Sequence, residues 1–302
     1  MSLNAAFESH RELLFRLSYR MTGSTADAED IVQDTFARAL ERPPIEDDRD
    51  LKPWLVQVAL NLGRDHLRRR KRLGYTGPWL PAPLETEGAD DATPSHPEAR
   101  YGELESVSHA FLVALEALTP AQRACVILRD VLGHSVSEAA TLLRVSESNL
   151  KTMHHRARAK LSEYDAQRVP LTRELQGRTR EALVKLFMSL LAGDVASLES
   201  MLAQDVMAIN DGNGEYFAAR VPLLGRERVI KFHIKVGAKR GSPAFAIRQI
   251  NGLPAVVCEF FRHVDGMAPR AVIALVLDRQ GHVRWLNTTV ASGKLSRLRF
   301  DI

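Results

Sequence analysis

The sequence predicts a multidomain chain in which two all-α parts precede an α+β part. The length of 302 residues is enough for about two domains of ordinary size. Apolar residues recur at helical spacing through residues 7–72 and again through residues 101–164. Beyond residue 205, short runs rich in β-branched residues predict strands near 244–250, 254–262, 270–277 and 282–290, with a helix at 226–237. Helices followed by a mostly antiparallel sheet indicate the α+β class for this last part.

The first helical part begins with an amphipathic helix whose apolar stripe includes Leu14 and Met21 and which Gly23 ends. Ser24, followed three residues later by Asp27, is the capping pattern that opens a second helix. One face of that helix is apolar. The other face is acidic and polar and could meet a partner; its residues are Asp27, Asp30, Gln33, Asp34 and Arg38.

A loop at residues 42–52 follows, because Pro43 and Pro44 remove backbone donors and restrict the residues before them. Pro53 begins a third helix, which ends in an arginine-rich patch over residues 64–72. Residues 73–100 have the proline, glycine and acidic composition of a linker. Within the linker, residues 79–84 (Trp-Leu-Pro-Ala-Pro-Leu) are too apolar to remain fully exposed to solvent, so we expect them to dock on a protein surface.

The spacing in residues 137–162 predicts two short helices joined by a turn at Arg144 and Val145. Ser146 can cap the second helix, whose core stripe is Leu150, Met153, Ala157 and Leu161. The opposite stripe suits a DNA major groove, and it consists of Ser148, Lys151, Thr152, His155 and Arg156. Spacing alone leaves two alternatives open, a DNA-reading helix-turn-helix and a helical hairpin with a solvated face.

Net charge does not locate a nucleic-acid surface. Residues 1–168 hold 22 Lys and Arg against 25 Asp and Glu, whereas residues 169–302 hold 19 against 12. A nucleic-acid surface must therefore be located from the places where basic residues cluster. Cys125 and Cys258 lie far apart in apolar stretches, which favours two buried free thiols over a disulfide or metal site. We expect no cofactor, no metal and no membrane contact, and the absence of a secretory signal predicts a cytoplasmic protein.

Residues 11–164 resemble a bacterial sigma factor of the extracytoplasmic-function class. Residues 19–24 (Tyr-Arg-Met-Thr-Gly-Ser) and 27–36 are similar to that family's first sigma domain, which grips core RNA polymerase. Residues 54–72 resemble its promoter-melting helix, and residues 118–123 (Leu-Thr-Pro-Ala-Gln-Arg) with the helix-turn-helix resemble its second sigma domain. Three signals in the right order are far more specific than one.

The resemblance extends to a subgroup with a fused SnoaL-like domain. Its linker motif stands here at residues 79–84, its Asp-Gly-Gly-Gly-Lys-like motif at 211–215, and its C-terminal motif at 291–295. Glu215 replaces the expected lysine, and the last motif keeps only Lys294 and Leu295. The resemblance implies region 2 at residues 5–72, the linker at 73–100, region 4 at 101–165 and a nuclear-transport-factor-2-like cone at 170–302.

The resemblance also implies roles for individual residues. It places polymerase contacts at Asp27, Asp30, Gln33, Asp34 and Phe36. It places promoter contacts at Asn61, Arg64, Arg68, Arg69 and Arg70 and on the outer stripe of the second helix of the helix-turn-helix, with Arg158 and Lys160 on phosphate or solvent. It places regulatory contacts at Trp79, Leu80, Pro81, Leu84, Asp211, Gly212, Gly214, Lys294 and Leu295.

The expected function is that of an alternative sigma factor, which binds core RNA polymerase and promoter DNA and is modulated in cis by its C-terminal domain. Two other classes stay open: a helix-turn-helix regulator that needs no polymerase, and an enzyme or ligand sensor that uses the C-terminal pocket. Catalysis would need a carboxylate base and an oxyanion donor. The candidates do not form such a pair by spacing, so we expect no enzyme; they are Asp211, Tyr216, His233, His263 and Asp265.

Overall fold

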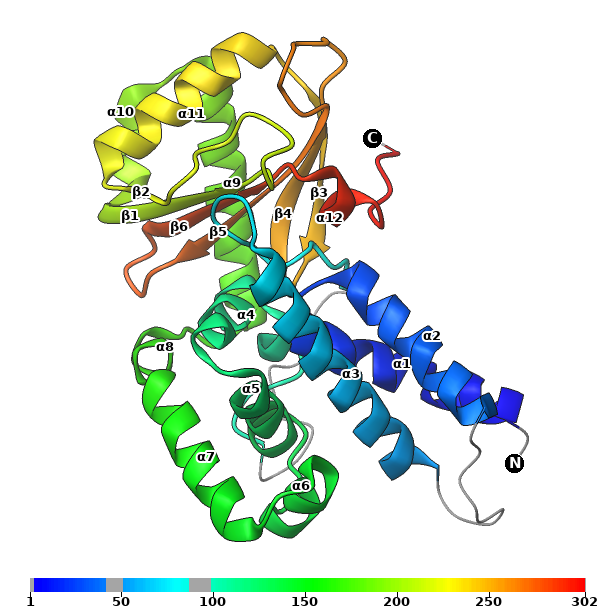
Figure 1. Cartoon of the computed structure of the whole chain (residues 1–302). Helices are drawn as coiled ribbons and strands as arrows, with labels where there is room; N and C mark the ends of the chain where they lie inside the picture. Colours follow the sequence, from blue (N-terminus) through cyan, green and yellow to red (C-terminus); the bar gives the residue numbers. More distant parts are fainter. Residues whose placement is uncertain (1–2, 42–50, 87–98, 302) are drawn as a thin grey trace. The chain divides into compact units, whose positions relative to one another are not determined.

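A computed structural model describes residues 3–41, 51–86 and 99–301 of the chain (Figure 1). Part of the expected loop, residues 42–50, lies outside the described residues. The chain divides into two compact units. The first comprises Met1–Gly74, Thr93–Val107 and Phe111–Ala166, and the second comprises Tyr75–Ala92, Ser108–Ala110 and Gln167–Ile302. The described linker residues 75–86 thus belong to the second unit.

The first unit is helical, as the sequence predicts. Its elements are α1 (Leu3–Thr22), α2 (Thr25–Glu41), α3 (Lys52–Leu73), η1 (Glu105–Val107), α4 (His109–Ala114), η2 (Leu115–Ala117), α5 (Pro120–Val126), η3 (Ile127–Val131), α6 (Val136–Leu143), α7 (Glu147–Lys160) and α8 (Ser162–Gln167). The first two residues of α4 and the last residue of α8 belong to the second unit. One apolar cluster runs through both helical parts and contains Leu14, Ile31, Leu60, Leu128 and Leu150. The two parts therefore share a core within this unit.

Capping residues set the helix limits that the sequence predicts. Gly23 has a positive φ of 66° after α1, and the Ser24 hydroxyl accepts from the Asp27 amide at 3.2 Å. Thr119 and Gln122 form a reciprocal capping box at the start of α5, with Pro120 in the first turn. These side chains satisfy amide donors that a helix start leaves without partners.

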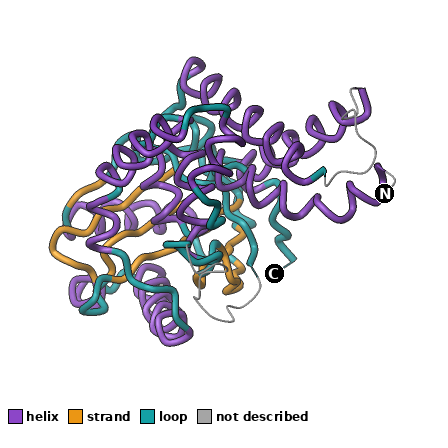
Figure 2. The backbone as a smooth tube through the Cα atoms, turned by 90° about the horizontal axis from the view of Figure 1, so that it is seen from below, coloured by secondary structure: helices purple, strands orange, loops and turns teal. Residues whose placement is uncertain are grey.

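The second unit is a six-stranded sheet with helices, which confirms the α+β class. Its elements are α9 (Arg173–Ala192), α10 (Val195–Met201), β1 (Leu202–Asp211), β2 (Leu223–Leu224), α11 (Arg226–Arg240), β3 (Ala244–Ile250), β4 (Leu253–Glu259), β5 (Arg270–Leu277), β6 (Val283–Thr289) and α12 (Ser292–Leu295). The strand order is β2-β1-β6-β5-β4-β3, and only the β1–β6 pair among these strands is parallel. Figure 2 shows the strands gathered in this sheet.

The two faces of the sheet are covered differently. Helices α9, α10 and α11 lie over one face, and α12 with the chain's last residues lies on the other (Figure 1). Val257 and Val272 pack with Leu295 and Phe300 on the α12 side, whereas Ile273 faces the helices α9 and α11. This alternation follows from the two-residue period of a strand. Within the described ranges, we find no helix with the length and apolarity needed to cross a bilayer.

Gly177 offers a direct test of helix propensity in α9. It is exposed in the helix interior, and an added Cβ would meet no other atom within 4 Å. Gly177→Ala is therefore expected to raise the free energy of unfolding by about 0.5–1 kcal/mol, because alanine loses less backbone entropy on folding. Urea unfolding of the full chain measures the change.

Gly193, which ends the same helix, is the matched control. Its φ of 69° is left-handed, so Gly193→Ala should lower the stability by about 1 kcal/mol. Equal effects of the two substitutions would show that backbone conformation does not decide the outcome.

Candidate nucleic-acid interface and linker site

The outer face of α2 presents an acidic strip made of Asp30, Gln33 and Asp34, all three exposed. Asp27 is half-buried, with a carboxylate oxygen 3.8 Å from Nδ1 of His66. Phe36 differs from these residues, because it is only 6% exposed and its ring centroid lies 4.5 Å from that of Phe7. It packs in the core beneath the strip, and its contact with polymerase stays a prediction.

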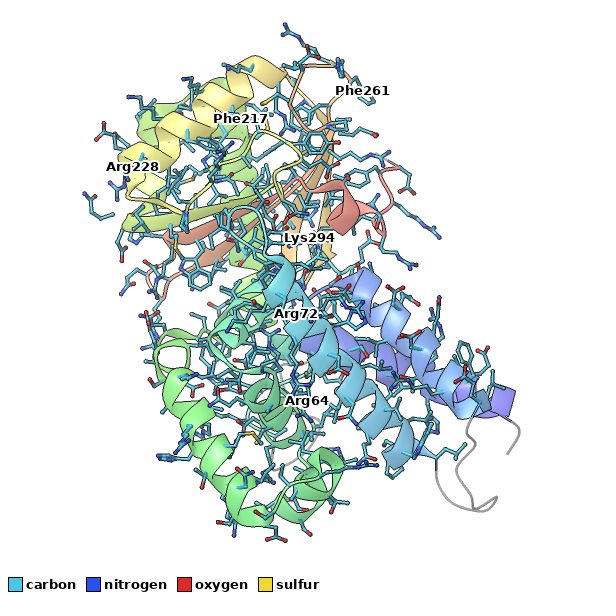
Figure 3. The ribbon with its side chains drawn as sticks, viewed as in Figure 1. Arg64, Arg72, Phe217, Arg228, Phe261 and Lys294 are labelled. Carbon is cyan, nitrogen blue, oxygen red and sulfur yellow. The ribbon has the colours of Figure 1, made fainter. Side chains whose placement is uncertain are left out.

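The expected promoter residues of α3 lie along one helix, where Figure 3 labels Arg64 and Arg72. Asn61 and Arg64 are half-buried, and an Arg64 Nη1 donates to the Asn61 Oδ1 at 3.5 Å. Arg68 and Arg69 are exposed, and Arg68 forms a surface ion pair with Asp65 at 2.9 Å. Such an exposed pair is worth little, so Arg68 can exchange Asp65 for a phosphate.

Arg70 has a structural role that the sequence did not reveal, and its contact with DNA stays a prediction. Its guanidinium donates to Glu116 at 2.6 Å and to the Thr22 carbonyl at 2.9 Å. Glu116 also holds Arg123, which is 2% exposed and donates to the Met21 carbonyl at 2.9 Å. Burial opposes ionisation, but the guanidiniums of Arg123 and Arg70 lower the pKa of Glu116. This network joins α3 and α5 to the end of α1.

The helix-turn-helix forms as the sequence predicts. Arg144 adopts a left-handed φ of 54° at the end of α6, and the Ser146 hydroxyl accepts from the Asn149 amide at 3.2 Å at the start of α7. Leu150 and Ala157 are buried. The predicted reading stripe is exposed at all five positions, namely Ser148, Lys151, Thr152, His155 and Arg156.

Two further residues of α7 stabilise the first unit. His154 lies with Nε2 2.9 Å from both carboxylate oxygens of Asp130. Lys160, expected on phosphate or solvent, donates to the Ala117 carbonyl and the Gln122 side chain, both at 3.2 Å. The basic residues along α7 therefore divide into a reading stripe and a group bonded to the protein itself, a distinction that charge alone does not show.

The Asp211 cluster holds the linker in the second unit, and we define it as Tyr75, Leu80, Asp211 and Lys294. The Asp211 carboxylate is fully buried and accepts from the Tyr75 hydroxyl at 2.5 Å, the Leu80 amide at 2.7 Å and Lys294 Nζ at 2.6 Å. Lys294 also donates to the Leu80 carbonyl. Its Nζ lies 4.6 Å and 4.7 Å from the ring centroids of Tyr75 and Trp79.

The linker also pairs with an edge of the sheet. Glu85 forms an antiparallel bridge with Ile250 at the end of β3, and the Thr86 amide donates to the Gln249 carbonyl at 3.0 Å. Leu80 is fully buried, as expected of an apolar linker that docks, and Pro81 is buried too. Because β3 is an edge strand, this segment covers backbone groups that would otherwise be open to another chain.

Close approach explains the glycines of the 211–215 motif. A Cβ on Gly214, whose φ is 74°, would lie 2.8 Å from a methyl carbon of Thr76 in the linker. A Cβ on Gly212 would lie 3.0 Å from the Tyr216 carbonyl oxygen. Glu215, which departs from the subgroup's lysine, accepts from the Ser292 amide at 2.9 Å and its hydroxyl at 2.5 Å. The substitution thus ties the motif to α12, a contact that sequence reasoning missed.

The residues considered for catalysis do not converge. Asp211 belongs to the linker cluster, and His263 pairs with Asp265 on the surface at 3.1 Å. His233 lines a cavity between the sheet and its helices, and none of the lining residues in the described structure is acidic. Cys125 and Cys258 are buried free thiols, as expected, and burial raises the pKa of each to about 12.

Comparison with known proteins follows the same division of the chain. The Sigma-70 region 2 family matches residues 6–73, and the Sigma-70, region 4 family matches residues 108–161. The ECF RNA polymerase sigma factor SigJ of Mycobacterium tuberculosis is 32% identical over 287 residues, which cover 92% of this chain and 89% of that protein. The probable ECF RNA polymerase sigma factor SigI of the same species is 33% identical over 165 residues, covering 53% of this chain and 54% of that protein.

The crystal structure of the extracytoplasmic function sigma factor SigJ from Mycobacterium tuberculosis gives a TM-score of 0.74 at 28% sequence identity. That match covers 97% of this chain and 98% of the SigJ chain. The similarity to SigJ therefore spans both units, whereas that to SigI spans about half of the chain.

Proposed function

Because this chain belongs to the extracytoplasmic-function family of RNA polymerase sigma factors, we propose that α3 and α7 contact two promoter elements while the Asp211 cluster restrains the linker between them. The sigma regions imply core RNA polymerase and promoter DNA as partners. The observation that supports the regulatory part is the fully buried carboxylate of Asp211, which holds both a linker amide and Lys294. We place this activity in the cytoplasm.

The acidic strip of α2 is the surface that we assign to core polymerase. Asp30, Gln33 and Asp34 are exposed on one helix face, and a carboxylate-rich face complements a basic partner surface. Asp30→Ala with Asp34→Ala should therefore weaken assembly of the holoenzyme. Glu181→Ala with Glu199→Ala removes the same charge from exposed positions of the second unit and is the control.

The promoter assignments follow from exposure and charge. Asn61 and Arg64 would meet unpaired bases or backbone of the downstream element, and Arg68 and Arg69 would hold phosphates. Unstacking a base costs a few kcal/mol. Binding of that base in a protein pocket and attraction between basic side chains and the phosphates of the strand offset this cost. The reading stripe of α7 would contact base edges of the upstream element in the major groove.

Run-off transcription with purified core polymerase tests the whole proposal. The full chain should add promoter-specific transcripts to core polymerase and should not protect promoter DNA alone. Duplex binding without polymerase would favour an ordinary helix-turn-helix regulator instead. The SnoaL-like domain's part in regulation is tested with variants of the Asp211 cluster, described in the Discussion.

Neutralising two exposed arginines of α3 should change the salt dependence of promoter binding. Arg68→Ala with Arg69→Ala is expected to reduce the slope of log affinity against log salt by about 1–2. Each phosphate contact releases counterions from the DNA, so the loss of two contacts lowers the number that binding releases. Filter binding of the holoenzyme over a salt series measures the slope. Arg180→Ala with Arg228→Ala, two exposed positions of the second unit, should leave it unchanged. An unaltered slope for the α3 pair would remove both residues from the interface.

A further inference from the structure

The cavity of the second unit lies between the sheet and its covering helices. The space that its walls enclose is about 710 Å³, open solvent at its mouth included. Helix α9 contributes Phe187 and Leu190, and α11 contributes Phe232 and Val236. Phe217 lies beside α11 in Figure 3 and lines the same cavity. The walls thus suit a flat apolar body.

Several polar atoms of the residues that line this cavity are buried, and no described residue offers them a hydrogen-bond partner. They are Asn210 Nδ2, Thr288 Oγ1, His233 Nε2 and Arg240 Nε. Asn210 and Thr288 are register partners on β1 and β6, so their side chains lie next to each other on one face. A buried polar atom without a partner costs free energy, and a ligand that pairs with it recovers that cost.

Arg240 sets the charge of the ligand. Its side chain is 8% exposed, and its guanidinium carbon lies 4.0 Å from the ring centroid of Phe260. One nitrogen donates to the Ala268 carbonyl, but no described carboxylate pairs with the charge. Burial lowers the pKa of this guanidinium, because the protein only partly replaces its hydration. A lining without acidic residues leaves the positive charge for an anion.

His233 determines whether the second polar contact of the ligand is to a donor or to an acceptor. Its Nδ1 lies 2.9 Å from the Val229 carbonyl, which can only accept, so Nδ1 carries the proton. Burial lowers the pKa of His233, so the ring is neutral at neutral pH and Nε2 is an acceptor. His233 and Arg240 lie seven residues apart on α11, about 10 Å along the helix axis. The cavity therefore offers an acceptor and a cation at separate points.

We propose that this cavity binds an aromatic carboxylate that carries a hydroxyl group, with the carboxylate on Arg240 and the hydroxyl donating to Nε2 of His233. The apolar body lies among the phenylalanine rings. Binding at this site requires neither polymerase nor DNA, so its presence or absence is separate from the proposed function.

Calorimetric titration of the full chain with para-coumarate tests the proposal. This probe has a flat body with a carboxylate at one end and a hydroxyl at the other. We expect a Kd on the order of 100 μM or tighter for a ligand of this size. The neutral para-coumaramide should bind at least about tenfold more weakly, and cinnamate, which lacks the hydroxyl, about fivefold more weakly.

Two arginine variants on one helix locate the site. Arg240→Met should weaken para-coumarate binding at least about tenfold and leave the amide nearly unaffected. Arg228 is exposed and lies toward the other end of α11 (Figure 3). Arg228→Met should therefore leave the affinities for para-coumarate and for the amide unchanged. If Arg240→Met does not fold, Arg240→Lys and the comparison of the three ligands on the unaltered chain still test whether the cavity binds the carboxylate.

Three results would each overturn the inference. The first is no binding of para-coumarate to the unaltered chain. The second is equal affinity for the acid and the amide. The third is equal loss of affinity with Arg228→Met and Arg240→Met, which would place the anion on the protein's general positive surface.

Discussion

Lys294→Met is expected to lower the free energy of unfolding of the second unit by about 3–5 kcal/mol, because it leaves a buried carboxylate without its cation. Asp211 is fully buried, and Lys294 is the cation on its carboxylate at 2.6 Å. The Tyr75 hydroxyl and the Leu80 amide remain as neutral donors, which do not replace a charge. Urea unfolding of the full chain measures the loss.

Matched variants separate this ion pair from general damage. Lys235→Met, at an exposed position of α11, should cost little. Asp211→Asn combined with Lys294→Met should be more stable than the sum of the two single losses predicts, because the double variant leaves no buried charge unpaired. Strictly additive losses would show that Asp211 and Lys294 do not stabilise each other.

The same variant tests the restraint on the linker. Lys294 bonds to the Leu80 carbonyl as well as to Asp211, so its loss should free the segment around Trp79. We expect faster proteolysis within residues 73–100 and a changed yield of promoter-specific run-off transcript. A linker as resistant as before, with an unaltered transcript yield, would separate the Asp211 cluster from regulation.

Lys151→Ala and Arg156→Ala should each reduce discrimination at the upstream promoter element by about 1–3 kcal/mol, the worth of a good contact to a base edge. Both side chains are exposed on the outer stripe of α7. Holoenzyme affinity for the promoter and for single-base variants of that element measures the change.

Arg158→Ala is the control on the same helix. Arg158 is half-buried at the edge of the stripe, and we expect it on phosphate or solvent, so its loss should affect all sequences alike. The same uniform loss for Lys151→Ala or Arg156→Ala would assign that residue to the DNA backbone instead of the bases.

Local chemistry in the sequence was sufficient to predict most of the helices. Glycine at 23, the serine at 24 and the serine at 146 act on their immediate neighbours, and each has its predicted role. Strand β1 was missed, because its start at residues 203–205 (Ala-Gln-Asp) has little strand propensity. It forms because it pairs in parallel with β6, some eighty residues later.

Some of the individual site residues could likewise be placed from the sequence, and others could not. The outer stripe of α7 and the acidic strip of α2 could be predicted, since helical period alone fixes which side chains face outward. The same helical period places Phe36 on the apolar face of α2, and the structure buries it there. Arg70 looked identical to Arg68 and Arg69, but Glu116, 46 positions away, bonds to it.

The family, the order of the helices and the exposed outer stripe of α7 could be inferred from the residues alone, because spacing and caps act within a few positions along the chain. The folded arrangement was needed to show which cations are already paired, what holds the linker and that no carboxylate among the described residues that line the cavity lies beside Arg240. These features depend on groups that are distant in sequence and become neighbours only when the core packs and water is excluded.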